Sequence, residues 1–274
     1  MSDGKIISCY SKIHKVGVTS ITLLTALNLA ETFLDKKVLI LDFNNRFLDI
    51  EKILEASSSD SSNIYDLLLS HKITKEDVVK CVVKVKSFSN LYLINGSYNY
   101  SFTPVFSETN LNDLLSVVKE MFDLIVIDTT SNTSTTTCSI INSAADICLN
   151  VLVQNSNQLI TILEHGELAD INAEKVINII NFFDEKKGIS LSELEKFYKL
   201  ENLYSLKQEN ALTYAMNTHN MQDFLSYSPE KKFFLDEFEE IFEDLCEKIG
   251  VELEEEIKPK GFFKNLFNKK KVSI

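Results

Sequence analysis

Apolar residues along the chain fall into short, nearly continuous runs that alternate with longer segments of helical periodicity. The short runs are rich in Val, Ile and Leu, which is typical of parallel strands buried on both faces. They predict strands at Lys5–Tyr10, Lys37–Asp42, Asn90–Ile94, Leu124–Asp128, Ile147–Val153 and Val176–Asn181.

The segments between these runs predict helices, because their apolar residues recur on one helical face. The expected helices are Thr19–Leu34, Asn63–Ser70, Lys75–Cys81, Leu111–Met121, Thr137–Ala144, Gln158–Leu168, Leu191–Phe197, Thr213–Asn217 and Glu230–Ile249. Strands interleaved with helices predict an α/β fold, a doubly wound and mostly parallel sheet with helices on both faces. Ligands of such folds bind at the carboxyl ends of the strands.

The pattern also predicts the organisation of the chain. Residues 1–250 are expected to form one domain, residues 251–260 a charged linker, and residues 261–274 an amphipathic basic tail. Few residues are Gly or Pro, 7 and 3 respectively, so most of the chain is expected to be regular structure.

Charge is distributed unevenly. The net charge is −12, but Lys258–Ile274 holds six lysines and no acid, so the preceding residues carry 22 bases against 40 acids, or −18. An acidic body repels the phosphates of nucleic acids, which makes them unlikely partners. Arg46 is the only arginine, so bidentate phosphate contacts from arginine are nearly excluded.

The cysteines and the apolar runs indicate the compartment. Five scattered cysteines without a C-x-x-C pair predict buried free thiols in a reducing cytosol rather than disulfides or a zinc site. We find neither a signal-peptide pattern nor an apolar run of about 20 residues, the length that spans a bilayer. We therefore expect a cytoplasmic protein.

The segment Cys9–Ser20 lies between the first predicted strand and the first predicted helix, where a phosphate-binding loop would be expected. Such a loop reads G-x-x-x-x-G-K-[ST]: glycine amides surround the phosphates, the lysine binds them and the hydroxyl binds Mg²⁺. Gly17 and Thr19 match the second glycine and the hydroxyl, whereas Val18 replaces the lysine. The segment predicts a nucleotide-binding scaffold whose catalysis is weakened or lost.

Two carboxylates stand at the ends of apolar strands. Asp42 ends Val38–Asp42, and Asp128 ends Leu124–Asp128, where a carboxylate would hold Mg²⁺ through water. The alternative is structural: both aspartates can cap the turns that follow, and Thr19 can be a helix cap.

Several motifs in this order resemble the ParA/MinD family of P-loop ATPases, which have a deviant loop, K-G-G-x-G-K-[ST]. The resemblance spans roughly residues 4–225 and includes Lys36–Asp42, Phe122–Thr129, Ala144–Asp146 and Leu152–Gln154. It implies bound ATP and Mg²⁺, although both can have been lost here, and a homodimer that holds nucleotide between its subunits.

The resemblance assigns roles to single positions. The signature lysine falls at Ile13, its glycines fall at His14 and Lys15, and Gly17, Thr19 and Ser20 match, so Gly17, Val18, Thr19 and Ser20 are candidate nucleotide contacts. An alternative register puts Lys15 at the signature lysine and Ser20 at the catalytic one. Either Lys12 or Lys15 could supply the missing ammonium.

The remaining roles follow from the same resemblance. Asp42 matches the catalytic acid that prepares the attacking water, whereas Asn44 replaces the second acid. Thr19 and Asp128, the latter through water, match the metal site. Asn181 matches the residue that contacts adenine.

The tail is the second strong signal. Phe262, Phe263, Leu266 and Phe267 fall on one helical face, and lysines flank them. Such a helix can lie in a membrane interface, where each lysine adds on the order of 1 kcal/mol on an anionic surface. The tail resembles the membrane-targeting helix of MinD. The predicted membrane contacts are Phe262, Phe263, Lys264, Leu266, Phe267, Lys269, Lys270 and Lys271, with docking on a protein partner as the alternative.

Three functional hypotheses remain open at this point. The first is a spatial regulator or scaffold on the inner face of the cytoplasmic membrane, acting in cell division or similar to atypical pilus-localising members (TadZ/CpaE-like), with weak or no ATP hydrolysis. The second is an active ATPase in which Lys12 or Lys15 serves the loop and drives membrane release. The third is an inert P-loop fold that acts only as a protein-interaction module.

Overall fold

The computed structural model describes residues 3–44, 49–56, 62–70, 72–96, 106–129, 135–164, 172–186, 188–225 and 231–253. The chain divides into two compact units, Met1–Leu149 and Asn150–Ile274. The predicted linker from residue 254 onward and the whole predicted tail, 261–274, lie outside the described residues.

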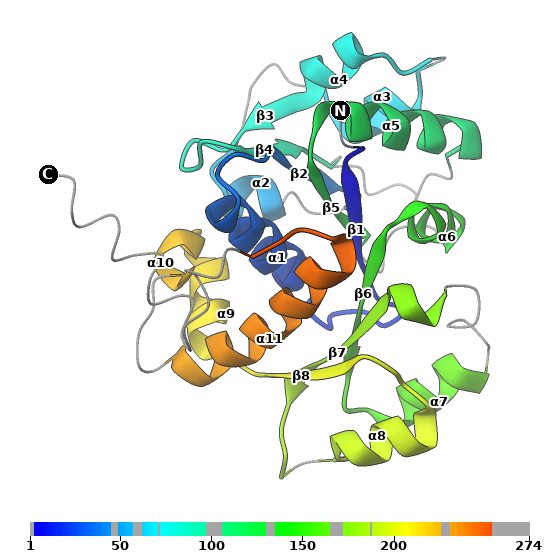
Figure 1. The fold of residues 1–274 in the computed structure, drawn as a ribbon, viewed down its shortest axis with the longest axis vertical. Helices are drawn as coiled ribbons and strands as arrows, with labels where there is room; N and C mark the ends of the chain where they lie inside the picture. The colour runs from blue at the N-terminus through cyan, green and yellow to red at the C-terminus, as the bar shows by residue number, and fades with distance from the viewer. Residues whose placement is uncertain are drawn as a thin grey trace, which may run out of the picture. The chain divides into compact units, whose positions relative to one another are not determined.

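In the described part of the chain, eight strands form a sheet in the order β3-β4-β2-β5-β1-β6-β7-β8 (Figure 1). Strand β3 pairs with β4 antiparallel, whereas β1 with β5, β2 with β5, β2 with β4, and β7 with β8 are parallel pairs. The predicted α/β class with a mostly parallel sheet is confirmed. The strands are β1 (Lys5–Tyr10), β2 (Val38–Asp42), β3 (Val82–Lys84), β4 (Leu91–Ile94), β5 (Leu124–Thr129), β6 (Ile147–Val153), β7 (Val176–Phe183) and β8 (Leu203–Lys207).

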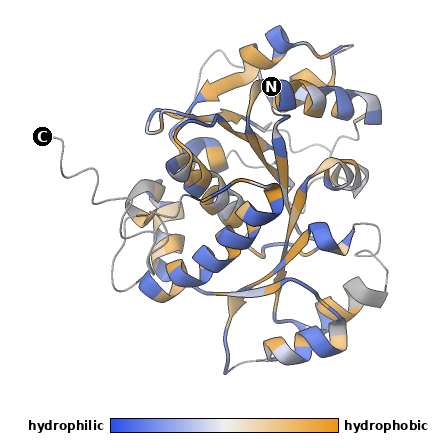
Figure 2. Cartoon of the chain, viewed as in Figure 1, coloured by the Kyte–Doolittle hydropathy of each residue, from blue (hydrophilic) through white to orange (hydrophobic). Residues whose placement is uncertain are grey.

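The first unit contains the helices α1 (Val18–Thr32), α2 (Asp49–Ile53), α3 (Ile64–Leu68), α4 (Lys75–Cys81), α5 (Glu108–Met121) and α6 (Thr135–Ala144). Helix α1 is buried on nearly all sides, from Val18 to Ala30, and it contacts β1, β2 and β5. An apolar surface around the whole helix is expected of a helix enclosed in a core. Figure 2 shows β1, β2, β5 and α1 largely in the colour of hydrophobic residues.

The register of three central strands decides where their polar ends lie. Cys9 and Tyr10 of β1 stand beside Asp128 and Thr129 of β5, and Asp42 of β2 stands beside Asp128 from the other side. Because parallel strands have their carboxyl ends at one edge, the loop after β1 and both aspartates are brought to the same edge.

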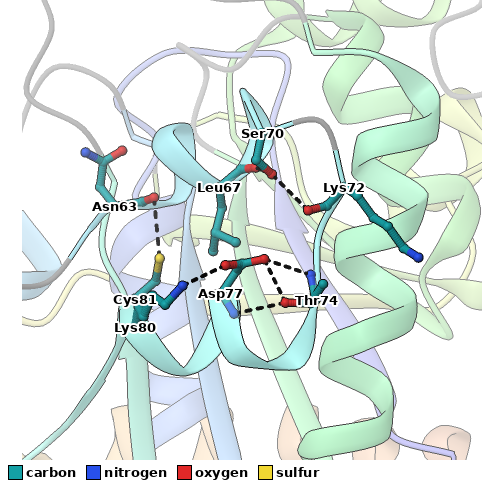
Figure 3. Close-up of polar contacts among 8 residues, drawn as sticks. All are labelled: Asn63, Leu67, Ser70, Lys72, Thr74, Asp77, Lys80 and Cys81. Atoms are coloured by element: carbon teal, nitrogen blue, oxygen red, sulfur yellow. Dashed lines mark hydrogen bonds and ion pairs between the residues drawn. The ribbon is translucent and has the colours of Figure 1, made fainter.

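Local sequence fixes the short helices of this unit. Thr74 caps the start of α4 with a capping box. Its hydroxyl accepts a hydrogen bond from the Asp77 amide, and the Asp77 carboxylate accepts one from the Thr74 amide at 3.3 Å (Figure 3). Lys80 adds an ion pair to Asp77 at 3.0 Å. Asn63 caps α3 in the same way, so two helices of five and seven residues start at defined points.

The second unit contains α7 (Ser156–Glu164), the 3-10 turn η1 (Ala173–Lys175), α8 (Leu191–Tyr198), α9 (Asn210–Asn217), α10 (Met221–Leu225) and α11 (Lys232–Ile249). Helix α11 packs on β8 and is strongly amphipathic. Its buried face consists of Phe234, Leu235, Phe238, Ile241, Phe242, Leu245, Cys246 and Ile249. It ends at Ile249, and the following Gly250 stops the helix because it adopts the left-handed conformation with a φ of 70°.

All six predicted strands are present; two have the predicted ends, and the others differ by one or two residues at one end. Strands β3 and β8 and helices α2 and α10 were not predicted, because each has at most five residues and no clear periodicity. Among the described residues, no helix combines the length and the apolar composition that crossing a bilayer requires.

Candidate functional site

The candidate site of the first unit lies at the carboxyl ends of β1, β2 and β5. Residues 11–17 connect β1 to α1, and the Ser11 hydroxyl accepts the Ile13 amide at 3.0 Å inside this connection. Gly17 is the N-cap of α1 with φ 93° and ψ 25°, a conformation that L side chains adopt only under strain. This requirement explains why the loop keeps a glycine at position 17.

The loop encloses apolar side chains. Ile13, Val16 and Val18 are 8%, 2% and 6% exposed, so the two positions where the resemblance puts lysines carry buried hydrocarbon. His14 and Lys15 are exposed, and Lys15 is held at φ 60°. The buried Val18 side chain has no hydrogen-bond donor or charge to offer a phosphate, and Lys15 is exposed.

Lys12 is the loop lysine with partial burial. Burial raises the pKa of the Cys138 thiol, near the start of α6, and the positive charge of Lys12 partly opposes this rise. Its charge therefore lies near the start of α6. Thr19 and Ser20, on the first turn of α1, are half-buried.

Asp42 and Asp128 face the same region from neighbouring strands. Both are buried, at 1% and 0% exposed, and neither oxygen of the Asp128 carboxyl has a hydrogen-bond partner among the described residues. Asp42 accepts the Asn44 amide at 2.8 Å. A buried carboxyl without a hydrogen-bond partner is costly, so a proton or a cation would stabilise Asp128.

Burial and neighbouring charges raise the pKa of both carboxyls. Burial, then the charge of Asp128, raises the pKa of Asp42 well above its usual range. Burial also raises the pKa of Asp128 to about 7, and the nearby Thr19 hydroxyl acts in the opposite direction. Like charges and low solvation both favour the neutral acid, so at least one of the two is protonated near neutrality without a cation.

Sequence analysis missed two residues beside this pair. Asp49, the first residue of α2, raises the pKa of both aspartates by its charge. The Tyr65 hydroxyl donates a hydrogen bond to the Phe43 carbonyl at 2.9 Å, and burial together with the charge of Asp42 raises the pKa of Tyr65. Asp49 follows the second strand by seven residues, and no motif marks it, so only the tertiary structure could place it here.

The donor set fits a divalent cation better than it fits a phosphate. Asp128, Asp42 and the Thr19 hydroxyl offer oxygen donors, the type that Mg²⁺ prefers, and Asp128 has lone pairs to spare. Three or more His, Cys, Asp or Glu side chains do not gather at one point in the described part of the chain. A cation would therefore complete its coordination with hydroxyls, water or a ligand.

The second unit holds the remaining predicted site residue. Asn181, near the end of β7, is buried, and its side-chain oxygen accepts the Phe182 amide at 3.0 Å. Phe182 is in the left-handed conformation at a bulge of β7, with φ 57°. A cavity of about 660 Å³ opens beside this bulge, lined by Val153, Gln154, Asn155, Phe182, Phe183, Asp184, Glu185, Lys186, Lys207 and Gln208.

No protein-family model matches the chain, and no curated protein matches its sequence. Solved structures do match its fold. A ParA family ATPase from Chlorobium tepidum TLS superposes with a TM-score of 0.70 at 18% identity, over 86% of this chain and 98% of that one. The fold is that of the ParA/MinD ATPases.

Two further structures support this assignment of the fold. The MinC:MinD cell division protein complex of Aquifex aeolicus gives a TM-score of 0.66 at 19% identity, over 91% of this chain and 97% of that one. MinD of Pyrococcus horikoshii OT3, a septum site-determining protein complexed with Mg-ADP, gives 0.67 at 16% identity, over 89% and 98%. The expected resemblance to the ParA/MinD fold is confirmed over most of the chain.

The structure brings some of the candidate residues together. Gly17, Thr19 and Asp128 are brought together at one edge of the sheet, and Asp42 adjoins them. The roles of Val18, Ser20, Lys12, Lys15 and Asn181 as nucleotide contacts remain predictions, as do the roles of Asp42 in catalysis and of Thr19 and Asp128 in metal binding.

Proposed function

We propose that this protein is a ParA/MinD-like spatial regulator or scaffold on the inner face of the cytoplasmic membrane, with a degenerate nucleotide site and weak or no ATP hydrolysis. The observation that carries the proposal is the burial of Ile13 and Val18 where the family has lysines. Without an ammonium at either position, the charge that develops on a transferred phosphoryl group has lost its main stabiliser.

The retained acids support binding of Mg²⁺-nucleotide without efficient turnover. Asp128 and Asp42 stay buried in register, although neutral side chains there would cost less free energy. The complex of MinD with Mg-ADP shows that the fold accommodates such a ligand in that protein. Binding with little hydrolysis suits a regulator that changes its partner affinity with nucleotide state.

The membrane part of the proposal rests on the sequence of residues 261–274. Four large apolar residues on one helical face and flanking lysines suit adsorption to an anionic leaflet. A single short helix binds weakly, so a homodimer would strengthen attachment by presenting two tails at once. The acidic body would hold the rest of the protein away from the surface.

Sedimentation with anionic vesicles tests the proposal. The full chain and a variant truncated after Glu256 are compared with and without Mg²⁺-ATP, and phosphate release is followed in parallel. Tail-dependent binding with slow or no phosphate release supports a regulator or scaffold. Equal sedimentation of both proteins, or none of either, would contradict the membrane role and leave docking on a protein partner.

An active ATPase is the second candidate. In that case the positions of the two lysines favour Lys12 over Lys15 as the source of the missing positive charge. Lys12 is half-buried close to Cys138, whereas Lys15 is exposed. If Lys12 supplies the missing charge, Lys12→Ala should abolish phosphate release while Lys15→Ala leaves it unchanged. Absence of ATP or ADP effects on the melting temperature at millimolar concentration would instead support an inert interaction module.

A further inference from the structure

One face of α11 is exposed and carries acidic side chains along nearly its whole length. Asp236, Glu240, Glu243 and Glu247 follow one another at spacings of four, three and four residues, so they share one stripe of the helix. We call these four residues the acidic stripe. Figure 2 shows hydrophilic residues along this helix, whose opposite side is buried.

No ion pair neutralises the acidic stripe in the described part of the chain. Its neighbours on α11 are paired: Glu237 binds Lys207 at 3.0 Å, and Asp244 contacts Lys248 at 3.7 Å. None of the four stripe residues makes an ion pair with another described residue. Like charges three and four residues apart destabilise a helix, so a basic partner on this face would relieve a repulsion already present.

An exposed aromatic residue extends the face. Phe233, three residues before Asp236, is 71% exposed, although the adjacent Phe234 and Leu235 are buried. The face thus offers one large apolar side chain followed by four carboxylates. A complementary occupant would be a short amphipathic segment that carries both lysines and phenylalanines.

The chain itself supplies such a segment. Residues 258–274 hold six lysines, no acid, and the apolar residues Phe262, Phe263, Leu266 and Phe267. In the sequence this segment follows α11, which ends at Ile249, after eight residues. We infer that the acidic stripe is the docking surface of the chain's own C-terminal tail, and that docking withholds the tail from anionic membranes.

The length of the connection permits this arrangement. The left-handed Gly250 ends α11, and the Val251 amide still bonds to the Cys246 carbonyl at 3.0 Å, so the chain leaves the helix axis there. The seven residues 254–260 span up to about 25 Å when extended, which approaches the roughly 27 Å length of α11. From Asp236 to Glu247 the stripe covers about 16 Å, comparable to a helix over residues 262–271, about 15 Å long.

The consequence is a competition for the same lysines, because those that face the acidic stripe cannot also face a lipid headgroup. This regulation rests on the proposed membrane function, but the docking itself does not. Anything that loosens the tail from α11, such as raised salt or a second basic partner, would release it.

Carbodiimide cross-linking tests the docking without any membrane. The reagent joins a lysine to a carboxylate only when they touch, and mass spectrometry of the full chain identifies the pairs. We expect tail lysines to be linked to the acidic stripe at low salt and not at 0.5 M salt. Absence of such links overturns the inference, and so do links that form only between differently labelled copies, since these would make a second chain the occupant.

A matched pair of variants then tests the consequence. One variant neutralises the stripe with Asp236→Asn, Glu240→Gln, Glu243→Gln and Glu247→Gln. The control removes the same number of charges elsewhere, with Glu55→Gln, Glu76→Gln, Asp113→Asn and Glu195→Gln. We expect the stripe variant to bind anionic vesicles about fivefold more tightly than the control, because the competent fraction of tails rises.

The outcomes separate the two proposals. Cross-links to the stripe without vesicle binding by any variant would leave the docking intact and contradict the membrane function. Vesicle binding that is equal in the stripe and control variants would show that the tail is not withheld, and would overturn the inference.

Discussion

Asp42 and Asp128 stand side by side in register on β2 and β5, both enclosed by the core of the first unit. Burial raises the pKa of both carboxyls, and the charge of Asp128 raises the pKa of Asp42 further. This pair makes the stability of the cation-free protein depend on pH, in a direction opposite to that of a salt-bridged aspartate.

The first prediction concerns Asp128→Asn. The pKa of Asp128 rises from 3.8 to about 7 on folding, so its contribution is fully present below about pH 4 and is lost as pH rises to about 7. Asp128→Asn should therefore be more stable than the wild type at pH 8, by about 1–3 kcal/mol, and nearly equal to it at pH 4.

Urea unfolding at the two pH values, without divalent cations, measures this difference. Asp113→Asn on α5 is the control, since Asp113 is half-buried outside the pair. A variant that is less stable than the wild type at pH 8 would show that the Asp128 carboxylate is stabilised in the fold rather than strained.

The second prediction concerns the lysine that the loop lacks. Val18→Lys restores an ammonium at the first residue of α1, where a charged hydrogen bond to a phosphate is worth about 1.5–3 kcal/mol. Mg²⁺-ATP affinity, measured by calorimetry, should rise about 10- to 100-fold. Val18→Met has similar length without charge and should bind as the wild type does. Equal gains in both variants would trace the effect to shape and not to charge.

The third prediction tests the backbone of the loop. Gly17→Ala places a side chain at φ 93°, which should lower the free energy of unfolding by about 1–2 kcal/mol. Lys15 occupies φ 60° with a side chain already, so Lys15→Gly removes strain but adds chain entropy, and its effect should stay within about 0.5 kcal/mol. Chemical denaturation of both variants provides the comparison, and similar losses in the two would refute this account of the glycine.

The fourth prediction concerns Gly96, which follows β4. A Cβ added there would meet the Asn44 carbonyl oxygen at 2.1 Å and the Asp42 carbonyl oxygen at 3.2 Å. These are backbone atoms that cannot move aside, so Gly96→Ala should lower the free energy of unfolding by more than about 2 kcal/mol. Thermal unfolding measures the effect; Gly250→Ala, which has open space around it but a φ of 70°, isolates the cost of strain alone.

Much of the fold followed from periodicity. The near-continuous apolar runs located six strands because parallel strands buried on both faces need such runs whatever surrounds them. Short elements were not predicted, because they are too short to show an apolar run or a periodicity. Strand β8, Leu203–Lys207, is an edge strand with mixed exposure, and it is held by β7 and α11 rather than by its own pattern.

Some residues of the candidate site were also predictable from the sequence, and others were not. The motifs of the sequence marked Gly17, Thr19, Asp42 and Asp128, since each belongs to a strand end or a helix start that a pattern can locate. They gave no hint of Asp49 or Tyr65, which approach the pair only through the folding of α2 and α3. Nor did they show that Ile13 and Val16 are enclosed by the loop.

The sequence by itself determined the fold class, the order of the main elements and the lack of a lysine at position 18, because these depend on residue types and their local spacing. Only the tertiary structure decided that Asp42 and Asp128 are buried side by side in register, and that the acidic stripe makes no ion pair with another described residue. Burial and the sum of neighbouring charges depend on residues far apart in the chain, and local patterns do not specify them.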